Sequence, residues 1–136
     1  MKFALLGYGR MGKAIEYIAL KRGHEIVCKV DEDLIEGKLQ EADVAINFSI
    51  PDAAVENISN ALDQAVPVVC GTTGWLDAYQ LVAQKTQENN TAFLYASNFS
   101  VGVNLFFKLN EVLAQMMQPY KEYKVSMEET HHLHKL

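Results

Sequence analysis

The stretch LLGYGRMGKA, residues 5–14, decides the fold class of this chain. It ends a short apolar run, KFALLG, that is typical of a buried strand, and it opens a segment whose apolar residues recur at helical spacing. Its three glycines, Gly7, Gly9 and Gly12, match the pattern GxGxxG. Between a strand and a helix, this pattern is typical of a loop that binds the pyrophosphate of a dinucleotide.

Each glycine has a physical role in this interpretation. Gly7 allows a tight turn, Gly9 lets the backbone approach a pyrophosphate, and Gly12 permits close packing of the helix on the strand. The helix N-terminus supplies free N–H groups and partial positive charge. Asp31 follows the next apolar run, where a carboxylate accepts hydrogen bonds from both ribose hydroxyls and repels a 2′-phosphate. Because Glu32 adds a second negative charge, we expect NADH to be preferred over NADPH.

Some alternatives stay open around this loop. A glycine-rich turn without a ligand would show the same three glycines. Arg10 either adds positive charge for the phosphates or is a solvated residue of the first helical turn. Lys29 and Lys38 lie near Asp31 in the sequence and would weaken the preference for NADH.

Apolar runs and helical periodicities alternate along the rest of the chain. The pattern predicts strands over residues 2–7, 25–30, 43–49, 67–71, 92–96 and 122–130. It predicts helices over residues 10–22, 51–65, 77–89 and 101–117, with at most one short helix in the polar segment 32–42. This order indicates an α/β fold, a Rossmann-type doubly wound parallel sheet with helices on both faces. In such sheets, ligands bind beyond the carboxyl ends of the strands.

Two loops at that edge carry polar residues. In NFSIPDA, residues 47–53, Ser49 or Asp52 could cap the following helix. CGTTGW, residues 70–75, offers backbone N–H groups and hydroxyls near the nicotinamide end of a cofactor. The alternative for this second loop is a simple cap of the next helix.

A third loop, ASNFSVGVN, spans residues 96–104. Asn98 and Ser100 could cap the long helix that follows, which we expect to be amphipathic or largely buried. Phe99 is suited to packing on a flat ring, although an aromatic residue alone is more often part of a core.

Composition excludes several classes of protein. The chain has 136 residues, 49% of them hydrophobic, a net charge of −5 and a pI of about 5.3. Negative charge argues against a partner that is a nucleic acid or an anionic membrane. Neither a signal peptide nor a transmembrane run is expected from the pattern. Cys28 and Cys70 lie in apolar runs, so we expect two reduced core thiols and a cytoplasmic protein.

Five motifs occur in a characteristic order: GYGRMG, NFSIP, GTTGW, NFSVGVN and EETHHLHK. Together they resemble the bacterial 4-hydroxy-tetrahydrodipicolinate reductases of the diaminopimelate and lysine pathway, over the whole length of the chain. The resemblance implies an NAD(P)H-dependent oxidoreductase of amino-acid biosynthesis. Its substrate would be a small cyclic dicarboxylate made from aspartate semialdehyde and pyruvate, and its full-length form a homotetramer.

The resemblance also implies site residues. His131 and Lys135 would be catalytic proton donors or acceptors, and His132 would contact a substrate carboxylate. Cofactor contacts would come from Gly7, Tyr8, Gly9, Arg10, Met11, Gly12, Asp31, Gly71, Thr72, Thr73, Ala96, Ser97, Asn98 and Phe99. The cofactor would be NADH, or NADPH with lower preference.

The histidine-rich stretch HHLHKL, residues 131–136, has other interpretations. Histidine is a common metal ligand, but no carboxylate or cysteine stands at zinc-like spacing with it, and we predict no metal site. A polar tail or the edge of a purification tag is the second alternative. The third is proton supply, because hydride addition to a conjugated C=N system leaves negative charge that histidine can neutralise near neutral pH.

The resemblance predicts the domain organisation. Residues 1–121 would form the dinucleotide-binding domain, and residues 122–136 would supply the first strand and the catalytic motif of a substrate domain that the chain does not complete. Such a chain is expected to bind cofactor with little turnover, since little of it would clamp the substrate or exclude water. The alternatives are a non-catalytic dinucleotide sensor and an aspartate-type amino-acid dehydrogenase.

Overall fold

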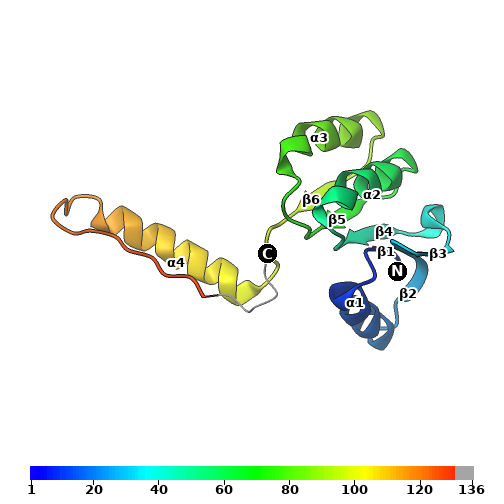
Figure 1. Ribbon diagram of the computed structural model, residues 1–136, viewed down its shortest axis with the longest axis horizontal. Helices are drawn as coiled ribbons and strands as arrows, with labels where there is room; N and C mark the ends of the chain where they lie inside the picture. Colours follow the sequence, from blue (N-terminus) through cyan, green and yellow to red (C-terminus); the bar gives the residue numbers. More distant parts are fainter. Residues whose placement is uncertain (131–136) are drawn as a thin grey trace. The chain divides into compact units, whose positions relative to one another are not determined.

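The computed structural model describes residues 1–130 and divides into two compact units, Met1–Phe99 and a second unit that begins at Ser100 (Figure 1). The elements of the first unit alternate between strands and helices, except that β3 directly follows β2. They are β1 (Lys2–Leu6), α1 (Arg10–Lys21), β2 (Glu25–Asp31), β3 (Leu34–Gly37), β4 (Val44–Asn47), α2 (Pro51–Asp63), β5 (Val68–Cys70), α3 (Tyr79–Glu88) and β6 (Phe93–Tyr95). Short 3₁₀ turns, η1 (Leu39–Glu41) and η2 (Leu76–Ala78), precede β4 and α3.

The strands form one six-stranded sheet in the order β3-β2-β1-β4-β5-β6. All neighbouring pairs are parallel except β2 and β3. The chain therefore winds outward from β1 in one direction and then from β4 in the other. This arrangement confirms the predicted Rossmann-type doubly wound sheet, and it places the reversal of strand order between β1 and β4.

One strand of this sheet was not expected. The polar segment after β2 forms a hairpin, in which Asp31 pairs with Leu34 and Cys28 with Gly37. Gly37 has φ +75°, and a Cβ there would lie 1.9 Å from the carbonyl oxygen of Val27. The short helix expected in this segment is reduced to the 3₁₀ turn η1. The hairpin was not predicted because its outer strand is largely exposed, and its two apolar residues are followed by a glutamate and a glycine, so it lacks the apolar run of the other strands.

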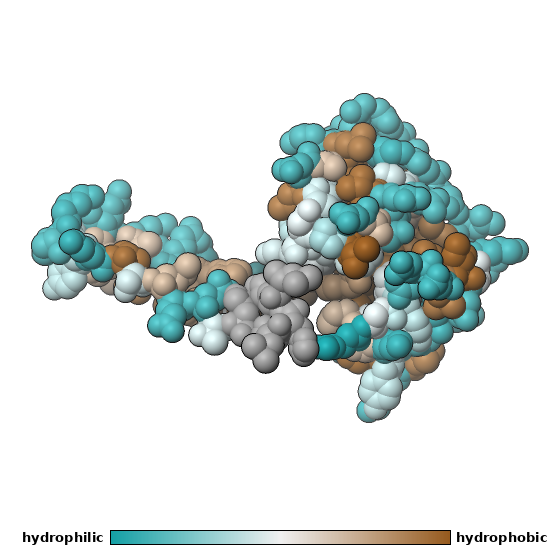
Figure 2. Space-filling view, viewed as in Figure 1, coloured by the Kyte–Doolittle hydropathy of each residue, from teal (hydrophilic) through white to brown (hydrophobic). Residues whose placement is uncertain are grey.

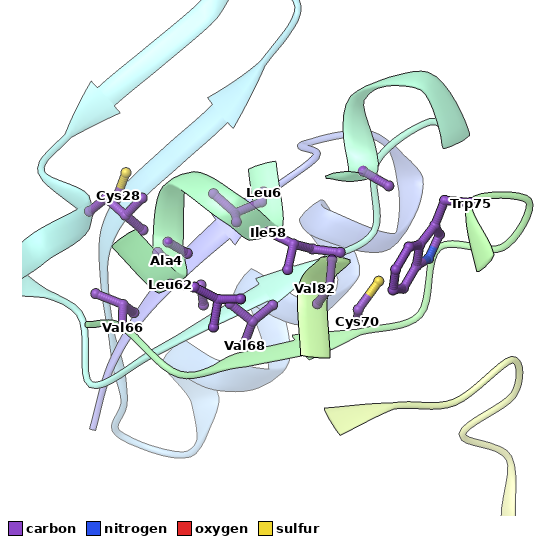
Figure 3. Close-up of a cluster of buried hydrophobic side chains, with 14 residues drawn as sticks. Ala4, Leu6, Cys28, Ile58, Leu62, Val66, Val68, Cys70, Trp75 and Val82 are labelled. Carbon is purple, nitrogen blue, oxygen red and sulfur yellow. The ribbon is translucent and has the colours of Figure 1, made fainter. Parts of the chain in front are cut away.

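Helices cover both faces of the sheet: α1 lies on one side, and α2 and α3 lie together on the other (Figure 1). The core is concentrated between the sheet and the two helices α2 and α3. Its large side chains include residues of β1, α2, α3, β5 and the β5–α3 loop, and Figure 3 labels Leu6, Ile58, Leu62, Val82 and Trp75 among them. Both cysteines, Cys28 and Cys70, are buried and free, as the sequence predicted. Burial raises the pKa of each thiol, which keeps it protonated and unreactive.

The second unit contains the helix α4 (Val101–Met117). Ser100 caps this helix by accepting a hydrogen bond from the backbone N–H of Val103, as expected. No residue of α4 is buried, and its apolar side chains lie on the surface of this unit (Figure 2). The helix was expected to be amphipathic or largely buried, and the second alternative is not met by the described residues. None of the helices in the described part of the chain is long and apolar enough to cross a membrane.

The segment 122–130 differs from its prediction as well. It was expected to form a strand, but no strand is present there. Alternation of apolar and polar residues favours an extended chain, but a strand also needs a neighbour that accepts and donates backbone hydrogen bonds. No such neighbour is present for this segment among residues 1–130.

Candidate functional site

At the carboxyl ends of the parallel strands, one further backbone hydrogen bond links the residue after a strand to the neighbouring strand. Gly7 donates to the carbonyl of Val30 at 2.7 Å, Phe48 to that of Leu6 at 2.9 Å, and Gly71 to that of Asn47 at 2.9 Å. The loops after β1, β4 and β5 therefore start at the same level of the sheet. This edge is where an open doubly wound sheet binds its ligand.

The β1–α1 loop has the shape that its glycines require. Gly7 has φ +94°, and a Cβ there would lie 2.3 Å from the carbonyl oxygen of Phe48. A Cβ on Gly12 would lie 2.4 Å from the carbonyl oxygen of Gly7, so helix and loop touch through backbone. By contrast, a Cβ on Gly9 would have nothing within 4 Å. The backbone at Gly9 is therefore open to a group that approaches from outside.

The N-terminus of α1 is suited to an anion. No side chain caps it, and its first turn contains no acidic residue. The backbone N–H of Lys13 makes the first bond of the helix, to the carbonyl of Gly9 at 3.1 Å. N–H groups earlier in a helix have no intrahelical acceptor and point out of its end, together with the positive end of the helix dipole. A phosphate placed there would be bound by both.

Asp31 lies at the end of β2, beside this loop. Its Oδ2 accepts a hydrogen bond from the backbone N–H of Tyr8 at 3.1 Å, and its Oδ1 accepts one from that of Glu32 at 3.1 Å. These two bonds orient the carboxylate. Because each carboxylate oxygen has two lone pairs, both oxygens can still accept from the hydroxyls of a ribose.

Asp31 lines a pocket of about 250 Å³. The other residues of its wall come from the β1–α1 loop, from β2 and the turn after it, from the β4–α2 loop and from α2: Gly7, Val30, Glu32, Ser49, Ile50, Ala53 and Asn57. Neither Lys29 nor Lys38 belongs to this wall. Lys29 Nζ is 2.8 Å from Glu16 Oε1, and Lys38 Nζ is 3.8 Å from Glu41 Oε1.

A second pocket, of about 360 Å³, lies along the same edge. It is lined by residues of α1, of the β4–α2 loop and of the β5–α3 loop: Arg10, Met11, Phe48, Ser49, Pro51, Gly71, Thr72 and Thr73. Ser49 lines both pockets, so the two adjoin at the β4–α2 loop. The expectation that Ser49 or Asp52 caps the following helix is wrong, since α2 starts at Pro51 with no side-chain cap.

The family model described as dihydrodipicolinate reductase, N-terminus, matches residues 1–99, which is also the extent of the first structural unit. The chain belongs to the dihydrodipicolinate reductase family. A 4-hydroxy-tetrahydrodipicolinate reductase of Christiangramia forsetii is 54% identical over 138 residues, an alignment that covers 100% of this chain and 58% of the relative. One from Methanocaldococcus jannaschii is 35% identical and is aligned over 96% of this chain and 43% of its own. The chain thus spans about half the length of these relatives.

Solved structures support the fold alone. A putative homoserine dehydrogenase of Archaeoglobus fulgidus has a TM-score of 0.56 at 16% identity, covering 70% of this chain and 42% of its own. A hyperthermophilic archaeal homoserine dehydrogenase in complex with NADPH has a TM-score of 0.55 at 15% identity, covering 69% and 43%. These similarities agree with the strand–helix alternation of the first unit.

Within this family member, Thr72 joins two of the loops that line the second pocket. Its hydroxyl accepts a hydrogen bond from the backbone N–H of Ser49 at 2.9 Å and donates to the carbonyl of Ser49 at 3.2 Å. The carbonyl of Thr72 accepts a hydrogen bond from the indole N–H of Trp75 at 2.7 Å. Trp75 is buried, with ring centroids 5.8 Å from Phe93 and 5.5 Å from Tyr95. Thr72 is therefore held on both sides, while Thr73 is exposed.

This difference predicts different effects for the two threonines. Thr72→Val keeps the shape of the side chain but leaves the N–H of Ser49 without its acceptor, which should destabilise the fold by about 1–3 kcal/mol. Thr73→Val should change stability by less than about 0.5 kcal/mol, as is usual for exposed positions. Urea unfolding followed by the fluorescence of Trp75, the sole tryptophan, would measure both. Equal stability of the two variants would contradict this account of Thr72.

The remaining predicted site residues fall into two groups. Ala96, Ser97, Asn98 and Phe99 follow β6 at the same edge of the sheet, but they line neither pocket. The ring of Phe99 has its centroid 6.2 Å from that of Phe48, which does line the second pocket. The other group, His131, His132 and Lys135, lies outside the described residues. Among residues 1–130, no group of three or more metal-ligating side chains is present.

Part of the site was not predicted from the sequence. The pocket walls include Phe48, Ile50, Pro51, Ala53 and Asn57, none of which was singled out for binding. Most of these are apolar or lie on the first turns of a helix, so their side chains alone suggest no ligand. Only their position in the chain could have indicated a binding role, since these residues follow β4, a strand next to the reversal of strand order.

Proposed function

We propose that this chain carries the dinucleotide-binding part of a 4-hydroxy-tetrahydrodipicolinate reductase. Family membership supports the reaction, and the geometry of the first unit supports the cofactor. The observation that carries the proposal is the pair of pockets that adjoin at Ser49, with the open backbone of Gly9 and the uncapped N-terminus of α1 at the same edge. An extended dinucleotide needs these three features in a row: a ribose site, a phosphate site and a site for the second ring.

The residues present fit such a cofactor. Asp31, with its carboxylate already oriented, would accept the hydroxyls of the adenosine ribose. The loop from Gly7 to Gly12 would bind the pyrophosphate through backbone N–H groups, with Arg10 adding positive charge. Gly71, Thr72 and Thr73 would border the nicotinamide, together with the loop after β6. When bound, the nicotinamide supplies the hydride that reduces the substrate.

Charge around the ribose pocket supports NADH as the preferred cofactor. Asp31 and Glu32 both belong to its wall, and no lysine or arginine is among the wall residues that the structure describes. Lys29 and Lys38, the two cations that could weaken this preference, are each paired with a glutamate. A 2′-phosphate would therefore meet negative charge without a compensating cation.

The proton chemistry is proposed from the family resemblance. His131 would donate or accept a proton at the reacting atoms, and Lys135 would be the second proton donor. His132 would bind a carboxylate of the dicarboxylate substrate. In this proposal residues 1–121 form the dinucleotide-binding domain, residues 122–136 begin the substrate domain, and the full-length protein is a cytoplasmic homotetramer.

Calorimetric titration with NADH and, separately, NADPH tests the cofactor part of the proposal. We expect a dissociation constant for NADH on the order of micromolar and weaker binding of NADPH, because the ribose pocket carries two carboxylates. Loss of NADH absorbance that depends on the condensation product of pyruvate and aspartate semialdehyde tests the reaction, in a protein of the relatives' length. Cofactor binding without such turnover would favour a dinucleotide sensor, and absence of binding would exclude both functions.

A further inference from the structure

Tyr8 lies in the phosphate-binding loop, but its side chain does not line either pocket. It turns away from the edge of the sheet, toward α1 and β2. Its hydroxyl donates a hydrogen bond to the carboxylate of Glu16 on α1. Nζ of Lys29, on β2, lies 4.8 Å from the centroid of its ring, within the range of a cation–π interaction.

Lys29 and Glu16 are themselves paired, at 2.8 Å, and their side chains are only 22% and 20% exposed. Tyr8, Glu16 and Lys29 therefore form a closed group of three contacts, here called the Tyr8 cluster. Lys29 and then Tyr8 lower the pKa of Glu16, while the hydrogen bond to Glu16 raises the pKa values of Tyr8 and Lys29. At neutral pH the cluster thus contains a neutral phenol, a carboxylate and an ammonium group.

The backbone of Tyr8 makes a second connection to β2. Its N–H donates to Oδ2 of Asp31 at 3.1 Å. Asp31 and Lys29 are two residues apart on one strand, so both lie on the same face of the sheet. The loop is consequently attached to β2 twice, once through the main chain of Tyr8 and once through its side chain.

This attachment lies between two glycines. Gly7 and Gly9 flank Tyr8, and glycine has more conformational freedom than any other residue. An anion held by backbone N–H groups requires those groups to point at one place, and ordering them on binding costs affinity. A side chain fixed in the middle of the loop removes part of that cost beforehand.

We propose that Tyr8 is a positioning residue that fixes the phosphate-binding loop through the Tyr8 cluster, without touching the cofactor. The inference rests on the proposed dinucleotide site and deepens it, since it concerns the pyrophosphate rather than the ribose. It also gives Tyr8 a different role from the direct contact that the sequence resemblance implied. The aromatic residue at this position of GxGxxG then serves through what its hydroxyl and ring reach on α1 and β2.

Tyr8→Phe tests the proposal, because it removes the hydroxyl and keeps the ring. Affinity for ADP and for NADH should fall by about three- to tenfold. This loss corresponds to the free-energy cost of ordering one or two side chains on binding. Affinity for adenosine, which lacks phosphate, should stay as in the wild type, because the N–H of Glu32 still orients Asp31. A matched control is Asp63→Asn, which removes one charge from the surface pair with Lys85 at 2.6 Å, outside both pocket walls.

A double-mutant cycle with Glu16→Ala gives a second test. If the hydroxyl of Tyr8 acts through Glu16, the double variant should lose no more ADP affinity than the larger of the two single losses. Independent, additive losses would overturn the proposal. So would a Tyr8→Phe variant that binds ADP as tightly as the wild type, or one that loses adenosine and ADP affinity equally.

NMR relaxation of the backbone amides of residues 7–9, measured without ligand, separates this inference from the proposed function. Tyr8→Phe should make these amides more mobile, and Asp63→Asn should leave them unchanged. Unchanged mobility in Tyr8→Phe would overturn the inference whatever the protein binds. If the wild type binds neither ADP nor NADH, the proposed function fails, and the relaxation data still decide whether Tyr8 orders the loop.

Discussion

Gly7→Ala should be among the most destabilising single substitutions in the first unit. A methyl group at this position would lie 2.3 Å from the carbonyl oxygen of Phe48 and 2.7 Å from Cα of Ser49, so backbone would have to move. Such overpacking costs about 1–3 kcal/mol. The φ of +94° adds about 1–3 kcal/mol, because residues with a Cβ rarely adopt this conformation. Both costs fall where the β4–α2 loop meets the phosphate-binding loop, so NADH affinity should fall as well.

Two other glycines serve as controls for the separate causes. Gly23 has φ +75°, and a Cβ there would have nothing within 4 Å, so Gly23→Ala should show the cost of the backbone conformation alone. Gly9→Ala meets neither a clash nor a positive φ, so it should leave stability nearly unchanged. It should still weaken NADH binding, since its methyl group would occupy the space through which a pyrophosphate approaches.

Urea unfolding followed by Trp75 fluorescence, with NADH titration of each folded variant, measures these effects. The expected order of stability is wild type and Gly9→Ala, then Gly23→Ala, then Gly7→Ala. A Gly7→Ala protein as stable as Gly23→Ala would mean that the close approach of Phe48 contributes nothing. A Gly9→Ala protein with unchanged NADH affinity would contradict the assignment of this loop to the pyrophosphate.

The sequence predicted the parallel strands because each carries its own signal. Strands buried on both faces are short apolar runs, and the glycines and prolines between them mark their ends. The helix from Pro51 was predicted for the same reason, because proline is favoured in the first turn. For these elements, local pattern and tertiary environment agree.

The hairpin strand β3 and the segment 122–130 show the limit of that reasoning. β3 is short and largely exposed, so only its pairing with β2 makes it a strand. Residues 122–130 have the opposite character, with a partly alternating pattern but no partner strand in the described chain. Strand formation depends on backbone hydrogen bonds to a partner strand, which the side-chain pattern of the segment itself does not encode.

The candidate site shows a similar division. The tight turn at Gly7 and the close packing at Gly12 were predicted, because backbone conformation follows from residue type and spacing, while the role of Asp31 toward a ribose stays a prediction. The connection between Thr72 and Ser49 was not predicted, since 23 residues separate them and only the alignment of β4 with β5 brings them together. The same holds for the Tyr8 cluster, in which a loop residue reaches a helix and a strand at once.

Exchanging the carboxylates of the ribose pocket should reverse the cofactor preference. In the double variant Asp31→Ser, Glu32→Arg, the serine removes the repulsion of a 2′-phosphate and the arginine supplies a cation to bind it. A hydrogen bond to a charged group contributes about 1.5–3 kcal/mol, which corresponds to a change on the order of 10- to 100-fold in the ratio of NADPH to NADH affinity. Loss of the ribose hydrogen bonds to Asp31 should weaken NADH at the same time.

Glu41→Arg is a charge control for the Glu32→Arg part of the double variant, since Glu41 lies in η1 and belongs to neither pocket wall. It changes the net charge of the chain as Glu32→Arg does, so it reports any general attraction of the more anionic NADPH. Calorimetric titrations at several salt concentrations would separate general attraction from direct contact with the 2′-phosphate. Salt screens a long-range attraction strongly and a direct contact with the phosphate much less. If Glu41→Arg shifts the preference as much as the double variant does, the 2′-phosphate is not recognised at Asp31 and Glu32, and the ribose lies elsewhere.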